Sequence, residues 1–311
     1  MMMFRNFKRI RAWEIALTLA VMALPFVPAS PIAGYGSLVR HAHAAETPKK
    51  LDTTRLVSIG GDVTEIVYAL GEEKRLIARD STSLYPKEVT KLPDVGYMRA
   101  LSPEGILAVN PTAIIAVEGS GPPEALAVLH NASLPFETVP QTYDRDGILK
   151  KIDVVGSLLG VPEKAKVLRE KVAADLDAAI NGSAKRPEAE RKRVLFVLSL
   201  QNGKILASGS NTAADGIIKL TGAINAISGF SGYKSVTDEA IIEAKPDVIL
   251  IMDREGPLSM TNEDLLKQPA ISLTPAASHK AIIRMDGLHL LGFGPRTASA
   301  IRELNAAIYG G

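Results

Sequence analysis

The residues best suited to ligand chemistry lie in the segment Val95-Gly96-Tyr97-Met98-Arg99. A tyrosine phenolate is a hard anionic oxygen ligand for ferric iron, and a neighbouring cation favours the ionised form of the phenol. In an extended segment, the two-residue spacing of Tyr97 and Arg99 directs both side chains to the same side. Both residue types are also common on ordinary surfaces. The pair therefore indicates a ligand site only if the rest of the chain builds one around it.

Two glutamates occupy matching places in two copies of one pattern. Residues 102–115 align without a gap on residues 237–250, at an offset of 135 positions (237 − 102). In each copy a Ser or Thr precedes the glutamate, Glu104 or Glu239, by two residues, and a Pro ends the expected helix before an apolar strand. The helix dipole stabilises a carboxylate in the first turn, which accounts for each glutamate alone. It does not require the same placement in both halves of the chain.

The first part of the chain alternates apolar runs of strand length with segments of helical periodicity. This alternation is typical of parallel strands joined by helices. The apolar runs are 55–59, 76–78 and 113–117, and the helical segments are 63–70 and 124–130. We therefore expect residues 51–144 to form an α/β lobe.

A long helical stretch separates this lobe from a second one. Residues 146–180 are helical by pattern with one break at Gly160-Val161-Pro162, and a new buried strand begins at Val194. We assign residues 145–182 to a helical linker and residues 190–311 to a second α/β lobe. The expected fold is an α/β protein with two Rossmann-like lobes joined by one long α-helix.

The beginning of the chain has the pattern of a secretory signal peptide. A basic head, residues 5–11, precedes an apolar run, residues 15–27, and small residues allow cleavage after Ala29 or after Ala44. The apolar run is shorter than the ~20 residues that span a bilayer. The chain has no cysteine, which excludes the acylated cysteine of a lipoprotein. We expect residues 1–44 to be a signal peptide and flexible leader, and the remainder to be a soluble periplasmic protein.

Charge and motifs argue against two other classes of function. The leader holds five Lys or Arg and one Glu, a net +4, whereas the whole chain carries +2, so the remainder carries −2. A nucleic-acid-binding role therefore lacks the positive charge that it needs. The chain contains no Gly-x-Ser-x-Gly elbow, Walker-type phosphate loop, His-Glu-x-x-His motif or cysteine nucleophile. We expect no enzyme, and a hydrolase is the least favoured alternative.

Three features together resemble one family. They are the segment from Tyr97 to Glu104, the helix-joined lobes, and Met285-Asp286-Gly287 followed by Leu291-Gly292-Phe293-Gly294-Pro295-Arg296. The chain from about Arg55 onward resembles the periplasmic haem-binding component of bacterial haem ABC importers, within the group that also binds cobalamin and ferric siderophores. The resemblance implies a class III periplasmic binding protein fold. The Gly-Tyr-Met-Arg segment is the part that points to haem, and cobalamin or a ferric siderophore is the alternative ligand.

The resemblance also implies a role for individual residues. Tyr97 matches the tyrosine that ligates haem iron axially, and Arg99 matches the basic residue that contacts the phenolate or a haem propionate. Glu104 and Glu239 match the glutamates that dock onto arginines of the membrane permease. The other residues expected to contact haem are Tyr233, Arg254, Gln201 and Asn202. Since some relatives have a histidine where this chain has Gln201 and Asn202, Tyr97 is expected to be the only iron ligand from the protein.

The implied function is transport. Ferric haem (ferric protoporphyrin IX) is expected to bind in the cleft between the lobes and to pass to an inner-membrane ABC permease with its cytoplasmic ATPase. Haem is then a transported ligand, and no catalytic cofactor is expected. We expect the protein to act as a monomer, without a nucleic-acid partner, in iron acquisition.

Overall fold

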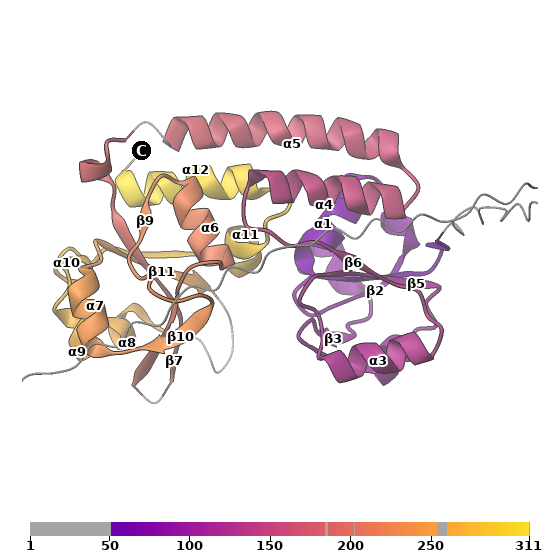
Figure 1. Cartoon of the computed structure of the whole chain (residues 1–311), viewed down its shortest axis with the longest axis horizontal. Helices are drawn as coiled ribbons and strands as arrows, with labels where there is room; N and C mark the ends of the chain where they lie inside the picture. Colours follow the sequence, from indigo (N-terminus) through magenta and orange to yellow (C-terminus); the bar gives the residue numbers. More distant parts are fainter. Residues whose placement is uncertain (1–50, 184–185, 202, 254–259, 311) are drawn as a thin grey trace, which may run out of the picture. The chain divides into compact units, whose positions relative to one another are not determined.

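The computed structural model describes residues 51–183, 186–201, 203–253 and 260–310. The predicted signal peptide and leader lie outside the described residues. The described residues build a four-stranded and a six-stranded sheet, each flanked by helices, and a separate two-stranded hairpin. Two further helices lie between the two larger sheets in the sequence (Figure 1).

The first sheet has four parallel strands in the order β2-β1-β5-β6. The strands are β1 (Leu56–Ile59), β2 (Leu76–Arg79), β5 (Ala113–Val117) and β6 (Phe136–Val139). The accompanying helices are α1 (Gly61–Ala69), α2 (Pro103–Ala108), α3 (Pro123–Asn131) and the short 3₁₀ helices η1 (Glu73–Arg75) and η2 (Lys87–Lys91). The central strands β1 and β5 are buried along their whole length, which explains why they read as continuous apolar runs.

The second sheet has the strand order β10-β8-β7-β11-β12, with β9 paired to β7. Strands β7, β11 and β12 are parallel, whereas β8 is antiparallel to both β7 and β10. The strands are β7 (Arg193–Gln201), β8 (Lys204–Ser208), β9 (Ile224–Asn225), β10 (Tyr233–Val236), β11 (Val248–Asp253) and β12 (Ile282–Asp286). The helices are α6 (Ala213–Leu220), α7 (Asp238–Ala244), α8 (Asn262–Leu266), α9 (Pro269–Ser272), α10 (Pro275–Ser278), α11 (Gly287–Leu291), α12 (Thr297–Tyr309) and the 3₁₀ helix η3 (Glu188–Glu190).

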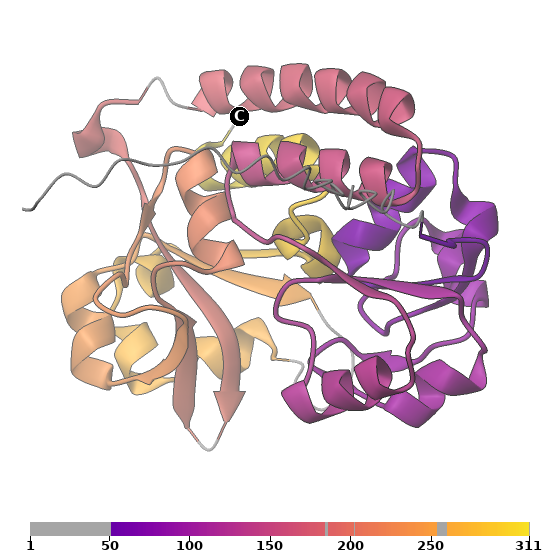
Figure 2. The same ribbon diagram turned by 45° about the vertical axis from the view of Figure 1, so that its right-hand side comes forward.

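Two helices connect the sheets, α4 (Arg145–Leu158) and α5 (Pro162–Ser183). The chain turns between them at Gly160, which has φ +71°, and Pro162 begins α5 because its ring favours the first helical position. Helix α4 packs on α1 of the first lobe, and α5 packs on both α4 and α12 (Figures 1 and 2). The predicted fold class is confirmed, with the 22-residue α5 as the long joining helix. The residue limits that we assign to the lobes remain a proposal.

The motif Phe293-Gly294-Pro295-Arg296 packs the second lobe onto helix α1 of the first. Arg296 donates from Nε to Glu65 Oε2 at 3.1 Å and makes a second bond to Glu65 Oε1. A Cβ on Gly294 would lie 3.4 Å from Glu65 Oε2, so a side chain there would contact the partly buried ion pair. The Phe293 ring is buried and lies edge-on to Tyr143, with the ring centroids 5.3 Å apart. This motif therefore has a structural role in joining the lobes.

Candidate functional site

Tyr97 lies on a small antiparallel hairpin formed by β3 (Gly96–Tyr97) and β4 (Ala100–Leu101). Tyr97 pairs with Ala100, so Met98 and Arg99 form the two-residue turn. The expectation that Tyr97 and Arg99 share an extended segment is therefore wrong, because Arg99 lies in the turn. Gly96 has φ +100°, a conformation that residues with a side chain rarely adopt. The Tyr97 side chain is 49% exposed, which leaves its phenol accessible to a ligand.

Backbone hydrogen bonds hold the hairpin at the edge of the first sheet where its strands end. Ser81 N, after β2, donates to Gly96 O at 2.9 Å, and Gly121 N, after β5, donates to Met98 O at 2.9 Å. Leu101 N donates in turn to Gly121 O at 2.9 Å. Loops at the carboxyl ends of parallel strands are where α/β lobes collect their ligand contacts. The hairpin is thus fixed where a ligand between the lobes would meet it.

Tyr233, the predicted ligand-contact residue of the second lobe, lies at the start of β10. Burial raises the pKa of the Tyr233 phenol above its usual value. The Ala214 backbone, the Thr212 side chain and the positive charge of Arg99 lower the pKa by smaller amounts, whereas Tyr143 raises it. The effect of Arg99 is the smallest of these. The Tyr233 hydroxyl is hydrogen bonded at the start of α6, and its ring packs on the core of its own lobe, with its centroid 6.2 Å from that of Phe196.

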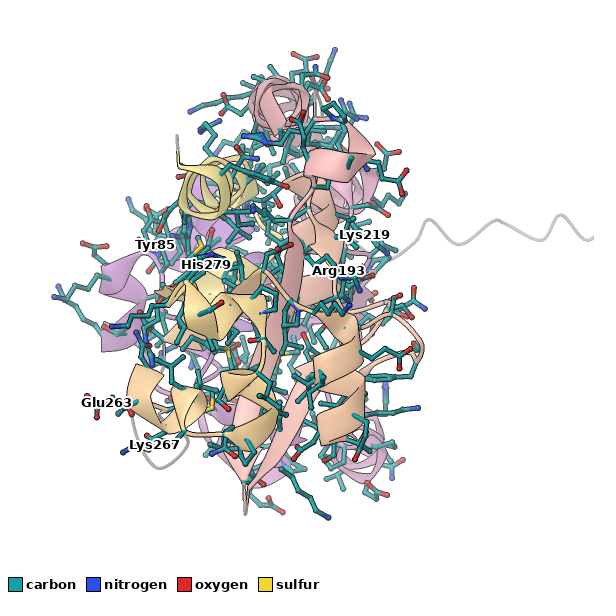
Figure 3. All side chains as sticks on the ribbon, turned by 90° about the vertical axis from the view of Figure 1, so that its left-hand side faces the viewer. Tyr85, Arg193, Lys219, Glu263, Lys267 and His279 are labelled. Carbon is teal, nitrogen blue, oxygen red and sulfur yellow. The ribbon has the colours of Figure 1, made fainter. Side chains whose placement is uncertain are left out.

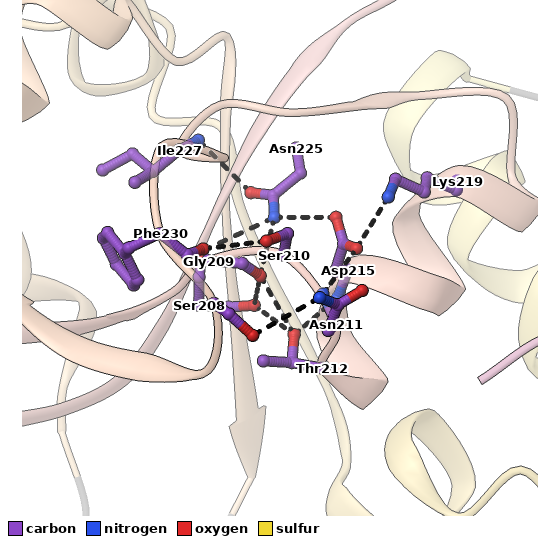
Figure 4. Close-up of polar contacts among 11 residues, drawn as sticks. Ser208, Gly209, Ser210, Asn211, Thr212, Asp215, Lys219, Asn225, Ile227 and Phe230 are labelled. Carbon is purple, nitrogen blue, oxygen red and sulfur yellow. Dashed lines mark hydrogen bonds and ion pairs between the residues drawn. The ribbon is translucent and has the colours of Figure 1, made fainter. Parts of the chain in front are cut away.

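A buried polar cluster under Tyr233 fixes the start of α6 (Figure 4). Thr212 accepts from Asp215 N at 3.0 Å, and Asp215 accepts from Asn225 Nδ2 at 3.0 Å and from Lys219 Nζ at 2.7 Å. Ser208 Oγ lies 2.5 Å from Thr212 Oγ1. Our reading of the sequence missed this cluster. The spacing of Thr212 and Asp215 is a helix-capping signal that could have revealed it.

The effect of Arg99 on the pKa of Tyr233 can be tested by titration. Arg99→Gln removes a positive charge near Tyr233, so we expect the Tyr233 phenol to ionise at higher pH than in the parent protein. The measurement is the ultraviolet absorbance of phenolate, with Tyr233→Phe identifying the signal. Because folding raises this pKa, the stability contributed by the protonated phenol is present below the ordinary tyrosine pKa of ~10 and is lost as the pH rises through the folded value.

Lys91→Gln is the matched control, since it removes an exposed positive charge from the same lobe. It should leave the Tyr233 titration unchanged. An identical titration curve in Arg99→Gln and the parent protein contradicts the electrostatic contact.

The structure describes two of the other four predicted ligand-contact residues. Tyr233 is described above, and Gln201 is exposed at the end of β7, paired with Lys204 of β8. Asn202 and Arg254 lie outside the described residues. Our assignment of Gln201, Asn202 and Arg254 to the ligand site therefore stays a prediction.

The two predicted docking glutamates occupy the same local structure in the two lobes. Ser102 Oγ accepts from Gly105 N at 3.2 Å and donates to Glu104 Oε2 at 3.1 Å. Thr237 Oγ1 accepts from Ala240 N at 3.3 Å. Hydrogen bonds from the backbone and from the Thr237 side chain lower the pKa of the Glu239 carboxyl, which favours its ionised form. Both glutamates are exposed beside a hydroxyl N-cap.

The two helices also end in the same way. Asn110 after α2 and Lys245 after α7 have φ values of +51° and +45°, the left-handed conformation of a helix C-terminus. An arginine at the start of each lobe's first strand bonds the end of the helix: Arg55 Nη2 donates to Val109 O at 2.8 Å, and Arg193 Nε donates to Ala244 O at 2.6 Å. Figure 3 labels Arg193 on the second lobe. The sequence repeat is therefore also a structural repeat.

A pocket of about 350 Å³ lies between the lobes and contains none of the predicted site residues. It is lined by Leu84, Tyr85, Asp286, Leu288, His289, Arg296 and Glu303. The Arg296 guanidinium lies 3.7 Å above the Tyr85 ring centroid, and Arg296 Nη1 and His289 Nδ1 are 3.3 Å apart. His289 Nε2 is 3.3 Å from Glu303 Oε2. These contacts make the pocket a part of the lobe junction. Figure 3 labels Tyr85, one of the lining residues.

Within residues 51–183, 186–201, 203–253 and 260–310, no group of three or more His, Cys, Asp or Glu side chains could hold a metal ion. In the same ranges, no helix has the length and apolar character needed to cross a membrane.

Comparisons with known proteins agree with the fold and extend it. The family model of the periplasmic binding proteins matches residues 56–287. The solved structure of a periplasmic heme-binding protein from Roseiflexus sp. RS-1 in apo form is 39% identical, covers 82% of this chain and 98% of its own, and has a TM-score of 0.77. The resemblance inferred from the sequence is confirmed at the level of structural similarity.

Two curated relatives are more distant. An uncharacterized ABC transporter substrate-binding lipoprotein of Bacillus subtilis is 27% identical over 84% of this chain and 81% of its own length. A vitamin B12-binding protein of Pectobacterium atrosepticum is 25% identical over 81% of this chain and 90% of its own length. These relatives are substrate-binding proteins of transport systems rather than enzymes.

Proposed function

Because the chain belongs to the periplasmic binding protein family, we propose that it binds haem between its two lobes and delivers it to an ABC importer. The observation that carries the proposal is the position of Tyr97, an exposed phenol on a hairpin that backbone hydrogen bonds fix at the carboxyl ends of β2 and β5. The similarity to a heme-binding protein at 39% identity supports the same ligand.

The residues have distinct proposed roles. The Tyr97 phenolate coordinates the ferric iron, and Arg99 favours the phenolate or pairs with a haem propionate. The Tyr233 ring contacts the macrocycle. Gln201, Asn202 and Arg254 provide the remaining contacts. An amide is a poor ligand for ferric haem, so Tyr97 supplies the only coordinating atom from the protein.

The proposed partner is an inner-membrane ABC permease with its cytoplasmic ATPase. Glu104 and Glu239 dock onto basic residues of the permease, one from each lobe. We propose a monomer that is exported to the periplasm and released from its signal peptide. The absence of cysteine supports a free protein rather than a lipoprotein, in contrast to the lipoprotein relative of Bacillus subtilis.

Titration of the purified mature protein with haemin tests the ligand. We expect a Soret band together with a charge-transfer band of phenolate-bound high-spin iron, and saturation at a defined ratio of haemin to protein. Because the only tryptophan, Trp13, lies in the predicted leader, binding can also be followed through quenching of tyrosine fluorescence. Haemin spectra that do not change on addition of the protein contradict the proposed function.

Cobalamin is the second candidate ligand, since a vitamin B12-binding protein is among the relatives. A ligand that binds only the folded state raises the free energy of unfolding by mass action, by ~2.7 kcal/mol at 100 times its Kd, and so raises the melting temperature. Parallel melting curves with haemin, cobalamin and a ferric siderophore therefore identify the ligand. We expect haemin to raise the melting temperature. A rise with cobalamin alone would contradict haem as the ligand and identify cobalamin instead.

A further inference from the structure

Two exposed aliphatic side chains occupy the same place in the structural repeat. Leu107 on α2 is 38% exposed and Ile242 on α7 is 39% exposed, and each follows its lobe's docking glutamate by three residues. Residues three apart on a helix are neighbours on one face. The preceding residues, Ile106 and Ile241, are fully buried in the lobe cores. Each short helix therefore buries one aliphatic side chain and presents the next one beside a carboxylate.

The internal stability of the lobes does not explain this repetition. A single exposed aliphatic residue is ordinary on a protein surface. Here the same residue class recurs at an offset of 135 positions (242 − 107), in helices with matching N-caps and matching left-handed ends. Leu107 and Ile242 are thus presented in the same local frame as Glu104 and Glu239.

Exposed aliphatic side chains also lie on the neighbouring elements. Helix α3 packs on α2, and helix α9 packs on α7. Val128 of α3 is 46% exposed, and Leu273, directly after α9, is 69% exposed. Both lobes therefore have an exposed aliphatic residue on the docking helix and another on the element packed beside it.

We propose that each lobe contacts the permease through a combined docking point, Glu104 with Leu107 and Glu239 with Ile242. The inference rests on the proposed function, which supplies the permease as the partner. At each docking point the permease is expected to supply a cation that pairs with the carboxylate and an apolar recess that receives the adjacent aliphatic side chain. Because the two docking points are alike, the permease surface that fits them presents the same basic and apolar site twice. Two copies of one permease subunit would provide such a surface.

The two components of a docking point should respond differently to salt. Ion pairs at a protein surface weaken as ionic strength rises, whereas apolar contacts do not weaken in this way. Apolar contacts act through the area that they remove from water. A variant that lacks the aliphatic side chains should therefore bind more weakly at every salt concentration. A variant that lacks the carboxylates should lose the dependence on salt.

The test measures the affinity of the chain for the permease–ATPase complex of the cognate importer in nanodiscs. We expect Leu107→Gln with Ile242→Gln to raise the Kd at least about ten-fold, with the salt dependence of the parent protein. Glu104→Gln with Glu239→Gln should also raise the Kd and should flatten the salt dependence. Val167→Gln is the matched control, because Val167 is a 69% exposed aliphatic residue on α5, outside both docking points.

The outcomes separate this inference from the proposed ligand. An unchanged permease Kd in Leu107→Gln with Ile242→Gln overturns the inference, and so does a loss of haemin affinity in that variant, which would assign the two residues to the ligand site. A parent protein that binds the permease but no haemin overturns the proposed ligand and leaves the docking result intact. A parent protein that binds haemin but not the permease overturns the inference and leaves the ligand intact.

Discussion

Tyr97→Phe is expected to lower the affinity for haemin by about 100-fold, which corresponds to ~2.7 kcal/mol. The substitution keeps the aromatic ring and removes only the phenolic oxygen that the proposal assigns to iron. Contacts between the porphyrin and the lobes remain, so weakened binding is expected rather than none. The charge-transfer band of phenolate-bound iron should disappear in the same variant. Haemin titration followed by absorbance measures both effects.

Tyr68→Phe is the control for this prediction. Tyr68 is a partly exposed tyrosine on α1, and the proposed site does not include it. Its replacement should leave the spectrum and the haemin affinity unchanged. A Tyr97→Phe variant with the haemin affinity and spectrum of the parent protein excludes Tyr97 as the iron ligand. In that case a different side chain must coordinate the iron.

Lys151→Met is expected to destabilise the fold by about 3–5 kcal/mol. Lys151 is fully buried on α4, where its ammonium pairs with Asp62 of α1 and donates to Gln141 Oε1 at 2.7 Å. Asp62 is also buried, so methionine leaves a carboxylate without its cation inside the protein. For a chain of this size the loss corresponds to a fall in Tm of roughly 6–20 °C. Thermal unfolding followed by circular dichroism measures it.

Two further variants distinguish the buried charge from a general effect of substitution. Lys150→Met, at an exposed position one residue earlier on the same helix, should change the Tm little. Asp62→Leu combined with Lys151→Met removes both charges and should recover much of the stability. If Lys151→Met unfolds at the temperature of the parent protein, the ion pair contributes little to the fold.

The fold and the repeat could be predicted because they depend on local signals. Buried parallel strands read as apolar runs such as 113–117, and Gly160 and Pro162 mark the end of one helix and the start of the next. The gapless alignment of residues 102–115 with 237–250 predicted two helices with the same caps. The hydrogen bonds of Ser102 and Thr237 now show those caps.

The candidate site was predicted only in part. The residue types of Tyr97 and Arg99 pointed to ligand chemistry, but a strand and a tight hairpin have similar sequences over five residues. The turn at Met98 and Arg99 is decided by the pairing of Tyr97 with Ala100 and by hydrogen bonds from the loops after β2 and β5. Spacing along the chain therefore misjudged the backbone conformation at Arg99.

The sequence by itself determined the fold class, the repeated glutamates and the residue types that ligand chemistry needs, since each follows from periodicity, caps or side-chain chemistry within a short window. Only the tertiary structure decided which distant residues meet. Glu65 and Arg296 are 231 positions apart and form a partly buried ion pair. Asp62 and Lys151 are 89 positions apart and form a buried one. Such contacts depend on how the elements pack, which no local pattern records.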